Sequence, residues 1–156
     1  MIEIKAPNEV PHTQGAPIVF LGGSIEMGTA DEWQKRAVER LEGLPCIILN
    51  PRRDSWNASW EQDISNEPFR EQVDWELDGL DRSNVIILNF HPNTRSPITL
   101  MELGLYAETK VVRVCCPPGF WRRGNVQIVC ERYGIPLYDS FDDLMDDVVQ
   151  YVIERI

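Results

Sequence analysis

The stretch Val85-Ile-Ile-Leu-Asn-Phe90 is the clearest strand signal in the chain, and Pro97-Ile-Thr-Leu-Met-Glu-Leu-Gly-Leu-Tyr-Ala107 follows it closely. A short, continuous apolar run with turn residues after it is typical of a buried strand. Proline is well tolerated at the first position of a helix, and the segment behind it is long enough to form one. We therefore expect a strand over residues 85–90, a turn over 91–96 and a helix that begins at Pro97.

The same alternation of short apolar runs and longer helical segments extends through the rest of the chain. Further strands are expected over residues 17–21, 46–49, 110–115 and 135–138, and helices over 68–82, 125–133 and 140–156. Another helix, with Thr29 or Asp31 as its N-cap, is expected between the first two of these strands. Strands that alternate with helices form a parallel sheet with helices on both faces. The sequence predicts a single α/β domain over residues 1–156, with a five-stranded parallel sheet and an irregular segment over residues 1–16.

The composition of the 156-residue chain narrows the classes of function. A formal net charge of −10 argues against nucleic acid as a partner, because phosphate backbones are bound through clustered lysine and arginine. The first residues hold no long apolar run, so neither a secretory signal nor a membrane span is expected. The four cysteines show no CxxC spacing, which favours reduced core thiols in a cytoplasmic protein.

Three segments are expected to meet at one edge of the sheet. In parallel α/β sheets, ligands bind beyond the carboxyl ends of the strands, where the strand order reverses. The segments that follow strands at this edge are Gly22-Gly23-Ser24, residues 50–67 and residues 90–102. The glycine pair allows a ligand to approach the backbone closely, but it lacks the GxGxxG and GK[ST] patterns of dinucleotide and phosphate loops. Taken alone, it is equally consistent with an ordinary tight turn.

The long segment over residues 50–67 carries Trp56 and Trp60. Loops of this length are usually either functional or disordered, and the two tryptophans argue against disorder. They form either an aromatic lid that stacks on a base or an anchor that fixes the loop to the core. The segment Arg52-Arg53-Asp54 either orients a ligand or forms ion pairs within itself.

Glu102 is the strongest candidate for a catalytic residue. It is the only charged residue in the helix expected to begin at Pro97, and Ile98, Leu105 and Tyr106 share its face at helical spacing. Burial of an unpaired carboxylate is unfavourable and shifts its pKa, as is common at active sites. Two alternatives remain open, namely a glutamate at the exposed edge of the helix and one paired with an arginine across the cleft.

Glu76 repeats this pattern on the helix over residues 68–82, where Val73 and Leu80 lie at helical spacing on either side. From the pattern alone, Glu76 is equally consistent with a charge on the helix surface and with a site residue. Two carboxylates that face one cleft suit glycosidic chemistry, because one attacks the anomeric carbon and the other handles the proton of the leaving group.

Four segments together resemble the nucleoside 2-deoxyribosyltransferase superfamily. They are Phe20-Leu-Gly-Gly-Ser-Ile25, Asn50-Pro-Arg-Arg-Asp-Ser-Trp56, Leu80-Asp-Arg-Ser-Asn-Val85 and Thr94-Arg-Ser-Pro-Ile-Thr-Leu-Met-Glu-Leu-Gly104. The last segment is the most specific, because the nucleophilic glutamate of the family precedes Leu-Gly on this helix. The resemblance implies a flavodoxin-like, Rossmann-like fold, in agreement with the alternation of strands and helices.

The resemblance also implies roles for individual residues. Glu102 matches the nucleophile that forms a covalent 2-deoxyribosyl ester, and Glu76 stands where the family usually has an aspartate that handles the base and its proton. Ser96 matches the position that binds the 5′ end of the sugar, which is a phosphate-contacting serine in the related 5′-monophosphate N-glycosidases. Asn125 resembles an asparagine that reaches the sugar site of a neighbouring subunit, and Phe20 replaces a tyrosine of some members.

The function implied by this resemblance is the transfer of 2-deoxyribose between nucleobases by a homo-oligomer that needs no metal or organic cofactor. Its partners would be a small-molecule deoxynucleoside and a free nucleobase. The expected catalytic residues are Glu102 and Glu76, and the expected substrate-binding residues are Phe20, Gly22, Gly23, Ser24, Asp54, Trp56, Ser96 and Asn125. Two alternatives remain: a hydrolase of 2′-deoxynucleoside 5′-monophosphates, with Arg95 and Ser96 at the phosphate, and a non-catalytic nucleotide-binding module.

Overall fold

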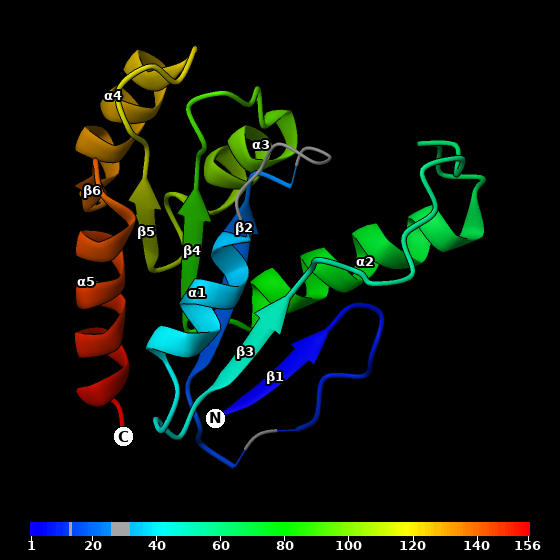
Figure 1. Ribbon diagram of the computed structural model, residues 1–156, viewed down its shortest axis with the longest axis horizontal. Coiled ribbons are helices and arrows are strands. Elements are labelled where there is room, and N and C mark those ends of the chain that lie inside the picture. Colours follow the sequence, from blue (N-terminus) through cyan, green and yellow to red (C-terminus); the bar gives the residue numbers. More distant parts are fainter. Residues whose placement is uncertain (13, 26–31) are drawn as a thin grey trace.

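The computed structural model describes residues 1–12, 14–25 and 32–156 of the chain (Figure 1). Within these residues, the parallel sheet consists of β1 (Ile2–Lys5), β2 (Ile18–Gly23), β3 (Ile47–Asn50), β4 (Val85–Asn89), β5 (Val112–Cys115) and β6 (Leu137–Tyr138). The helices are α1 (Trp33–Arg40), α2 (Glu67–Arg82), α3 (Pro97–Tyr106), α4 (Arg123–Tyr133) and α5 (Phe141–Ile153). The α/β class and the parallel sheet expected from the sequence are therefore confirmed.

The strands lie in the order β1-β3-β2-β4-β5-β6. From β3 to β6 this is the order of flavodoxin-like sheets, in which the chain starts inside the sheet and then extends it on both sides. β1 adds a sixth strand beside β3, so the expected count of five strands is wrong, and residues 1–16 are not irregular throughout. The sequence gives little signal for β1, because this edge strand has only four residues, in which Ile2 and Ile4 alternate with charged side chains.

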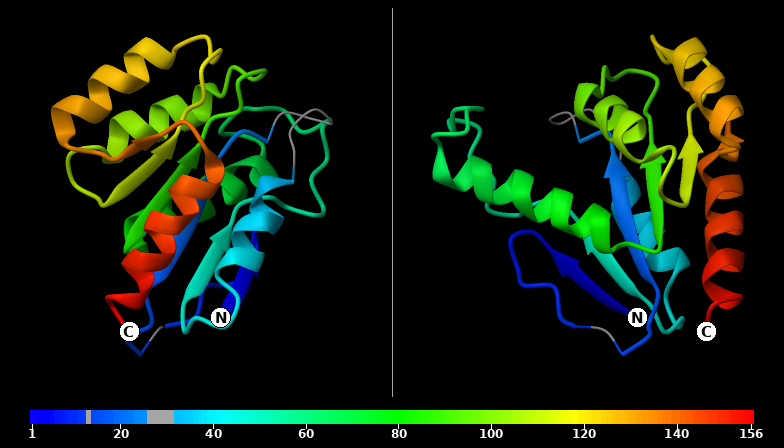
Figure 2. Two further views of the ribbon diagram at one scale, coloured as in Figure 1. Left: turned by 60° about the vertical axis from the view of Figure 1, so that its left-hand side comes forward. Right: turned by 180° about the vertical axis from the view of Figure 1, so that it is seen from behind.

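Helices cover both faces of the sheet (Figure 2). α1 and α5 cover one face, where Trp33 and Leu144 join buried residues of the strands. α2, α3 and α4 cover the other face through Leu80, Leu103 and Val126. Successive residues of β2 and β4 belong alternately to these two apolar clusters, as expected of strands buried on both sides.

Local signals place the ends of the helices close to their expected positions. Asn66 caps α2, because its side-chain oxygen accepts a hydrogen bond of 3.1 Å from the backbone N–H three residues further on. Ser140 caps α5 as expected, with acidic residues in the first turn. Thr29 and Asp31, the expected caps of α1, lie outside the described residues.

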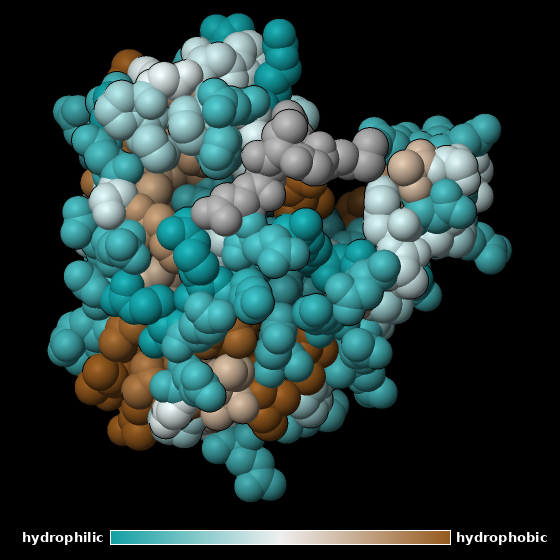
Figure 3. Space-filling model, in the orientation of Figure 1, coloured by the Kyte–Doolittle hydropathy of each residue, from teal (hydrophilic) through white to brown (hydrophobic). Residues whose placement is uncertain are grey.

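The first half of α2 and the loop before it project away from the sheet (Figure 1). In Figure 3 this projection forms a largely hydrophilic lobe at the right of the molecule. The end of α2 lies close against the sheet, because a Cβ atom at Gly79 would stand only 3.1 Å from the ring of Phe20. Glu76 lies between these two parts of the helix.

All four cysteines are free and buried, which confirms them as thiols of the core. Burial raises the pKa of Cys115 and of Cys130 to about 12, so these thiols stay protonated at neutral pH. Among the described residues, no helix is both long and apolar enough to cross a membrane.

Candidate active site

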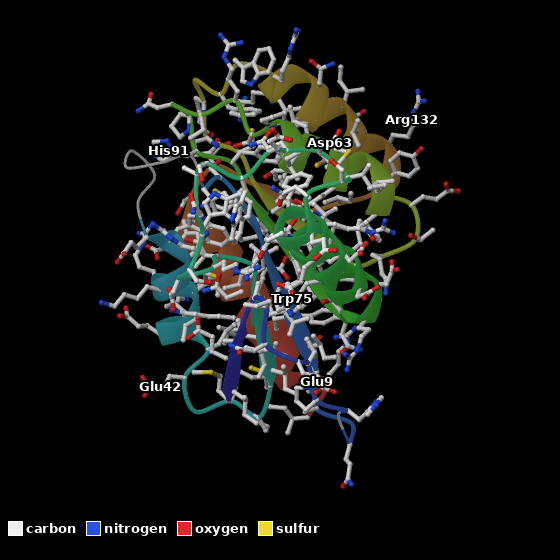
Figure 4. All side chains as sticks on the ribbon, turned by 90° about the vertical axis from the view of Figure 1, so that its right-hand side faces the viewer. Glu9, Glu42, Asp63, Trp75, His91 and Arg132 are labelled. Carbon is white, nitrogen blue, oxygen red and sulfur yellow. The ribbon has the colours of Figure 1, made fainter. Side chains whose placement is uncertain are left out.

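The carboxyl ends of β2 and β4 lie side by side at the point where the strand order reverses. The backbone N–H of Ser24, just after β2, donates to Asn89 O at 3.0 Å, and the N–H of His91 donates to Ser24 Oγ at 2.9 Å. Figure 4 shows this edge at the upper left, where His91 follows β4, while Trp75 of α2 lies nearer to the centre. The segments after β2 and β4 are therefore in contact, as the sequence predicts.

Glu102 lies in the middle of α3 with 7% of its surface exposed. Burial of the carboxyl group raises its pKa to about 8, and the negative charge of Glu76 adds to this rise. The exposed-edge alternative is therefore wrong. Pairing with an arginine does not fit either, because a nearby guanidinium would lower the pKa of the carboxyl group.

Glu76 is half-buried on α2 and is electrostatically coupled to Glu102 on α3. Burial raises the pKa of Glu76, and a hydrogen bond of 2.8 Å from Gln72 Nε2 to Glu76 Oε1 opposes that rise. Two helices thus bring together two carboxyl groups whose pKa values are both raised. Pairs of this kind are typical of sites for acid–base and nucleophilic chemistry.

A buried tyrosine links the two helices that carry these carboxyl groups. Tyr106 lies one turn beyond Glu102, and its hydroxyl donates to Asp81 Oδ1 of α2 at 3.0 Å. Lys110 Nζ, just after α3, donates to the backbone carbonyl of the same aspartate. Burial and the hydrogen bond to Asp81 raise the pKa of Tyr106 to about 12, so its hydroxyl remains a donor. These contacts fix the spacing of α2 and α3.

Three buried hydroxyl groups join the ends of β2 and β4 to the start of α3. Ser24 Oγ lies 2.8 Å from Thr94 Oγ1 and 2.6 Å from Ser96 Oγ, and the latter two atoms are 2.8 Å apart. Thr94 Oγ1 also donates to His91 O at 2.9 Å. Ser24 and Ser96 are therefore brought together, as expected for two residues of one site. Their hydroxyl groups face each other, however, and neither residue is more than 5% exposed.

Ser96 has a left-handed backbone, with φ 46° and ψ 53°, at the N-cap of α3. This conformation is uncommon for a residue other than glycine, and such strained residues cluster at functional sites. Its carbonyl accepts the first hydrogen bond of α3, from the N–H of Leu100 at 3.0 Å. The helix that carries Glu102 therefore starts from a backbone geometry that the hydroxyl cluster holds in place.

Gly22 and Gly23 are required by the packing of the sheet. A Cβ atom at Gly22 would lie 2.7 Å from Leu88 Cδ2, and one at Gly23 would lie 2.4 Å from Asn89 O. Gly23 also has φ +152°, which other residues rarely adopt. The group that approaches these two glycines in the structure is strand β4. Contact of these glycines with a ligand stays a prediction.

The two tryptophans of the long loop pack on each other. The ring centroids of Trp56 and Trp60 are 5.0 Å apart in an edge-to-face arrangement, and the guanidinium of Arg53 lies 5.0 Å from the Trp60 ring. Arg53 also forms an ion pair with Glu71 of α2, with 3.0 Å between Nη1 and Oε1. Trp56 is 39% exposed, and neither ring belongs to the apolar clusters beside the sheet. The two rings therefore do not anchor the loop in the core, and their role as an aromatic lid over a base stays a prediction.

Asp54 lies beside the edge strand β1 and is not among the groups that shift the pKa of Glu102. It is exposed and forms an ion pair of 3.3 Å with Lys5, rather than with an arginine of its own segment. The charge that raises the pKa of Glu102 is that of Glu76. Asp54 is therefore a poorer candidate than Glu76 for moving a proton next to Glu102.

Phe20 and Asn125 occupy very different surroundings. Phe20 is fully buried, and its ring centroid lies 6.4 Å from that of Trp75 on α2. The side chain has no exposed surface with which to contact a substrate, so the expected contact is replaced by packing beneath the helix of Glu76. Asn125 is exposed near the start of α4. Its contact with a neighbouring subunit stays a prediction.

Two polar residues of this edge were not expected from the sequence. Gln72 lies one turn before Glu76, and this spacing is visible in the sequence because residues four apart share a helix face. Thr94 gives no such signal, since its hydroxyl meets Ser24, which is distant in the sequence, only in the folded chain.

A further unexpected feature is the contact of Trp121 with the two arginines Arg95 and Arg122. Trp121 Nε1 donates to Arg95 O at 2.9 Å, which places the ring beside the residue that precedes Ser96. The guanidinium groups of Arg95 and Arg122 lie 5.1 Å and 4.5 Å from the centroid of this ring. Two cations therefore stand near the start of α3.

The polar groups of this edge are carboxyl, hydroxyl, amide and guanidinium groups. Among the residues that the structure describes, no three His, Cys, Asp or Glu side chains gather so as to hold a metal ion.

Parallel α/β sheets bind small ligands at the switch point, and here the helices that follow β3 and β4 carry two coupled carboxyl groups. The model of the nucleoside 2-deoxyribosyltransferase-like family matches residues 16–120 of the 156-residue chain. The chain therefore belongs to this family, which indicates a glycosyltransferase-like enzyme with small nucleoside substrates. The match includes Glu76, Ser96 and Glu102 and ends before Asn125. No individually curated protein matches the sequence.

Proposed function

We propose that this protein is a nucleoside 2-deoxyribosyltransferase, which moves 2-deoxyribose between nucleobases through a covalent ester on Glu102. Family membership supports this class of reaction. The observation that carries the proposal is the coupled pair Glu102 and Glu76, carried by two helices that cover the same face of the sheet. We place the protein in the cytoplasm, where its four free, buried cysteines stay reduced.

In the first step, a carboxylate oxygen of Glu102 attacks C1′ while the bond between C1′ and the base nitrogen breaks. The electron pair of that bond goes to the leaving base, which takes a proton from the carboxyl group of Glu76. The transition state resembles an oxocarbenium ion. A 2-deoxyribose reaches it more readily than a ribose, because it lacks the electron-withdrawing 2′-hydroxyl.

In the second step, a ring nitrogen of the acceptor base attacks C1′, the ester bond breaks and its electron pair returns to Glu102. Glu76 takes the proton that the acceptor nitrogen loses. Two successive inversions retain the configuration at C1′. When water attacks in place of a base, the product is free 2-deoxyribose.

The protonation of the pair sets the pH dependence of this mechanism. Glu102 must be ionised to attack, whereas burial holds its pKa at about 8 in the unliganded protein. The reactive form has a single proton, which lies on Glu76. The pair loses this last proton as the pH rises through about 8, so we expect kcat/KM to fall above about pH 8.

The test is chromatography of the protein after incubation with thymidine and free adenine. We expect deoxyadenosine to form, Glu102→Gln to abolish its formation, and Glu108→Gln, at an exposed site just beyond α3, to leave it unchanged. Near-normal activity of a folded Glu102→Gln protein would rule out Glu102 as the nucleophile. Free thymine without a new nucleoside would show that water is the acceptor.

A second candidate function is the hydrolysis of 2′-deoxynucleoside 5′-monophosphates, which the arginines around Trp121 favour. Arg95 and Arg122 bring two cations to the start of α3, next to Ser96. Guanidinium groups bind phosphate well, so a 5′-phosphate would be held there. The discriminating measurement compares thymidine with its 5′-monophosphate: a higher kcat/KM for the monophosphate, with release of thymine, would favour the hydrolase. Binding of either compound in a calorimeter without any product would favour a non-catalytic module.

We also propose that the enzyme is a homo-oligomer that docks through α3 and α4. Ile98, Met101 and Leu105 form an apolar face of α3, and each is more than half exposed. On α4, Ile128 is 65% exposed and shares a helix face with Asn125. Apolar side chains gathered on neighbouring exposed helices mark an interaction surface, and a second copy seated there would meet Asn125.

Light scattering after size-exclusion chromatography tests this assembly. We expect the wild type to be larger than one 18.0 kDa chain, and Leu105→Lys to be monomeric, folded and inactive. A wild-type protein that is monomeric and fully active would contradict the proposal.

A further inference from the structure

Gln72 is a buried polar residue that takes no part in the proposed reaction steps. It lies on α2 one turn before Glu76, and 4% of its surface is exposed. Its Nε2 atom donates to Glu76 Oε1 at 2.8 Å and to the backbone carbonyl of Pro51 at 2.8 Å. Pro51 follows β3 directly and begins the loop that carries the tryptophan pair. One amide thus joins a carboxyl group of the candidate site to the adjoining loop.

Two hydrogen bonds fix the orientation of this amide. Nε2 donates to two oxygen acceptors. If the amide were flipped, its own oxygen would face these two oxygens, and both hydrogen bonds would be lost. Gln72 Oε1 is consequently buried, and it has no hydrogen-bond partner among the residues that the structure describes. A buried, unpaired acceptor destabilises the folded state, and native proteins contain few of them. An apolar side chain of similar size would avoid this unpaired oxygen, so the packing of α2 does not by itself favour glutamine.

We propose that Gln72 is a positioning residue: it orients the Glu76 carboxyl group and determines how Glu76 and Glu102 share their proton. This inference rests on the proposed function. An N–H donor at 2.8 Å stabilises the ionised form of Glu76. In the unliganded protein, the shared proton therefore rests on Glu102, whose carboxyl group is the more deeply buried.

Among the groups around Glu76 and Glu102, Gln72 is the one that decides which of the two carboxyl groups holds the shared proton. From α3, the titratable group coupled to Glu76 is Glu102. Tyr106, one turn further, is coupled to Glu102 and to Asp81 and Asp78 of α2, and its hydroxyl is bound to Asp81. On the side of the loop, Arg53 forms its ion pair with Glu71. The hydrogen bond that acts on the ionisation of Glu76 is the one from Gln72.

Loss of this amide should have two separate effects on the reaction. Glu76 would retain its proton to a higher pH, because the donor that favours its ionised form is gone. Glu76 must hold a proton to release the leaving base, so the alkaline limb of the kcat/KM profile should move to higher pH. The carboxyl group would also lose its orientation, and we expect kcat to fall roughly tenfold, about the effect of one hydrogen bond to a charged group.

The test uses Gln72→Met, which keeps the length of the side chain but removes the donor, and Gln72→Leu as a second variant. The matched control is Gln150→Met. Gln150 donates to Glu154 at 3.0 Å with the same four-residue spacing, but on the exposed side of α5. The control removes the same kind of hydrogen bond at a position outside the candidate site.

Carbon-13 NMR of labelled glutamate side chains follows the titration of Glu76, and its signal is assigned by its loss in Glu76→Gln. We expect Glu76 to titrate at higher pH in Gln72→Met, with kcat roughly tenfold lower and KM little changed. Gln150→Met should match the wild type in both readouts. A folded Gln72→Met or Gln72→Leu protein in which Glu76 titrates as in the wild type would overturn the proposal.

The wild-type protein provides a measurement that needs no variant. The side-chain amide signals of Gln72 should shift over the pH range in which Glu76 titrates, and signals that stay constant would overturn the proposal. These titrations need no substrate. A wild type without any turnover would therefore refute the proposed function, while the role of Gln72 in the ionisation of Glu76 would still be decided.

Discussion

Replacement of Glu102 by glutamine should stabilise the protein by an amount that grows with pH. Burial raises the pKa of this carboxyl group to about 8, from an ordinary value of 4.5. Below pH 4.5 the group is protonated in the folded and unfolded chains, so it has no effect on the free energy of unfolding. As the pH rises from 4.5 to about 8, the unfolded chain releases this proton first, and the folded wild type loses stability. Glutamine has the same shape and cannot ionise, so the variant does not undergo this loss.

The size of the effect follows from the difference between the two pKa values. Each unit corresponds to about 1.4 kcal/mol. Apart from an offset that does not vary with pH, the variant should be more stable by about 3 kcal/mol at pH 7 and by at most about 5 kcal/mol above pH 8. The charge of Glu76 contributes to the raised pKa, so Glu76→Gln should reduce the same pH dependence by a smaller amount.

Urea denaturation followed by tryptophan fluorescence across this pH window measures the free energy of unfolding of each protein. Glu108→Gln is the control, because this glutamate is exposed, and its effect should stay within about 0.5 kcal/mol at every pH. The reasoning would be refuted by a difference between Glu102→Gln and the wild type that does not change with pH. It would also be refuted by a wild type that is more stable than the variant at alkaline pH.

Further substitutions test the packing of the sheet, the hydroxyl cluster and the aromatic loop. Gly23→Ala should destabilise the protein by more than about 3 kcal/mol in thermal or urea unfolding, because its Cβ would lie 2.4 Å from the backbone of β4. Gly43→Ala, at φ +84° in open space, should lose only about 1–2 kcal/mol. Ser24→Ala and Ser96→Ala should show a coupling of about 1 kcal/mol in a double-mutant cycle, since their hydroxyls are 2.6 Å apart, and strictly additive losses would argue against the cluster. Trp56→Ala should raise KM about tenfold with little change in kcat, because stacking of a base on an aromatic ring contributes ~1–3 kcal/mol; an unchanged KM would exclude the aromatic lid.

The sequence predicts the burial of Glu102 because its signal is local, although Ile98 and Leu105, expected on the same face, are more than half exposed. The catalytic role of Glu102 stays a prediction. A single charge in an otherwise apolar helix has to be buried, exposed at an edge or paired, and the helix spacing with Tyr106 favours burial. Glu76 is less certain from the same argument, since acidic residues are common on the exposed side of its helix. Its burial becomes evident only once α2 and α3 are placed on the same face of the sheet.

The features that the sequence does not reveal depend on contacts between distant segments. Ser96 could be assigned to the edge of the sheet, but not the inward direction of its hydroxyl, because Ser24 and β4 determine it. Phe20 was expected at the substrate, whereas the approach of α2 at Gly79 buries its ring completely. β1 was missed because pairing with β3, rather than its own short sequence, makes it a strand.

Mass spectrometry of an acid-quenched reaction tests most directly whether Glu102 is the nucleophile. The substrate would be a 2′-fluoro-substituted nucleoside, whose electron-withdrawing fluorine slows breakdown of the ester, without an acceptor base. We predict one added sugar on the peptide that contains Glu102, and no such adduct in Glu102→Gln. Turnover by a folded Glu102→Gln protein, or an adduct on a different residue, would contradict this account.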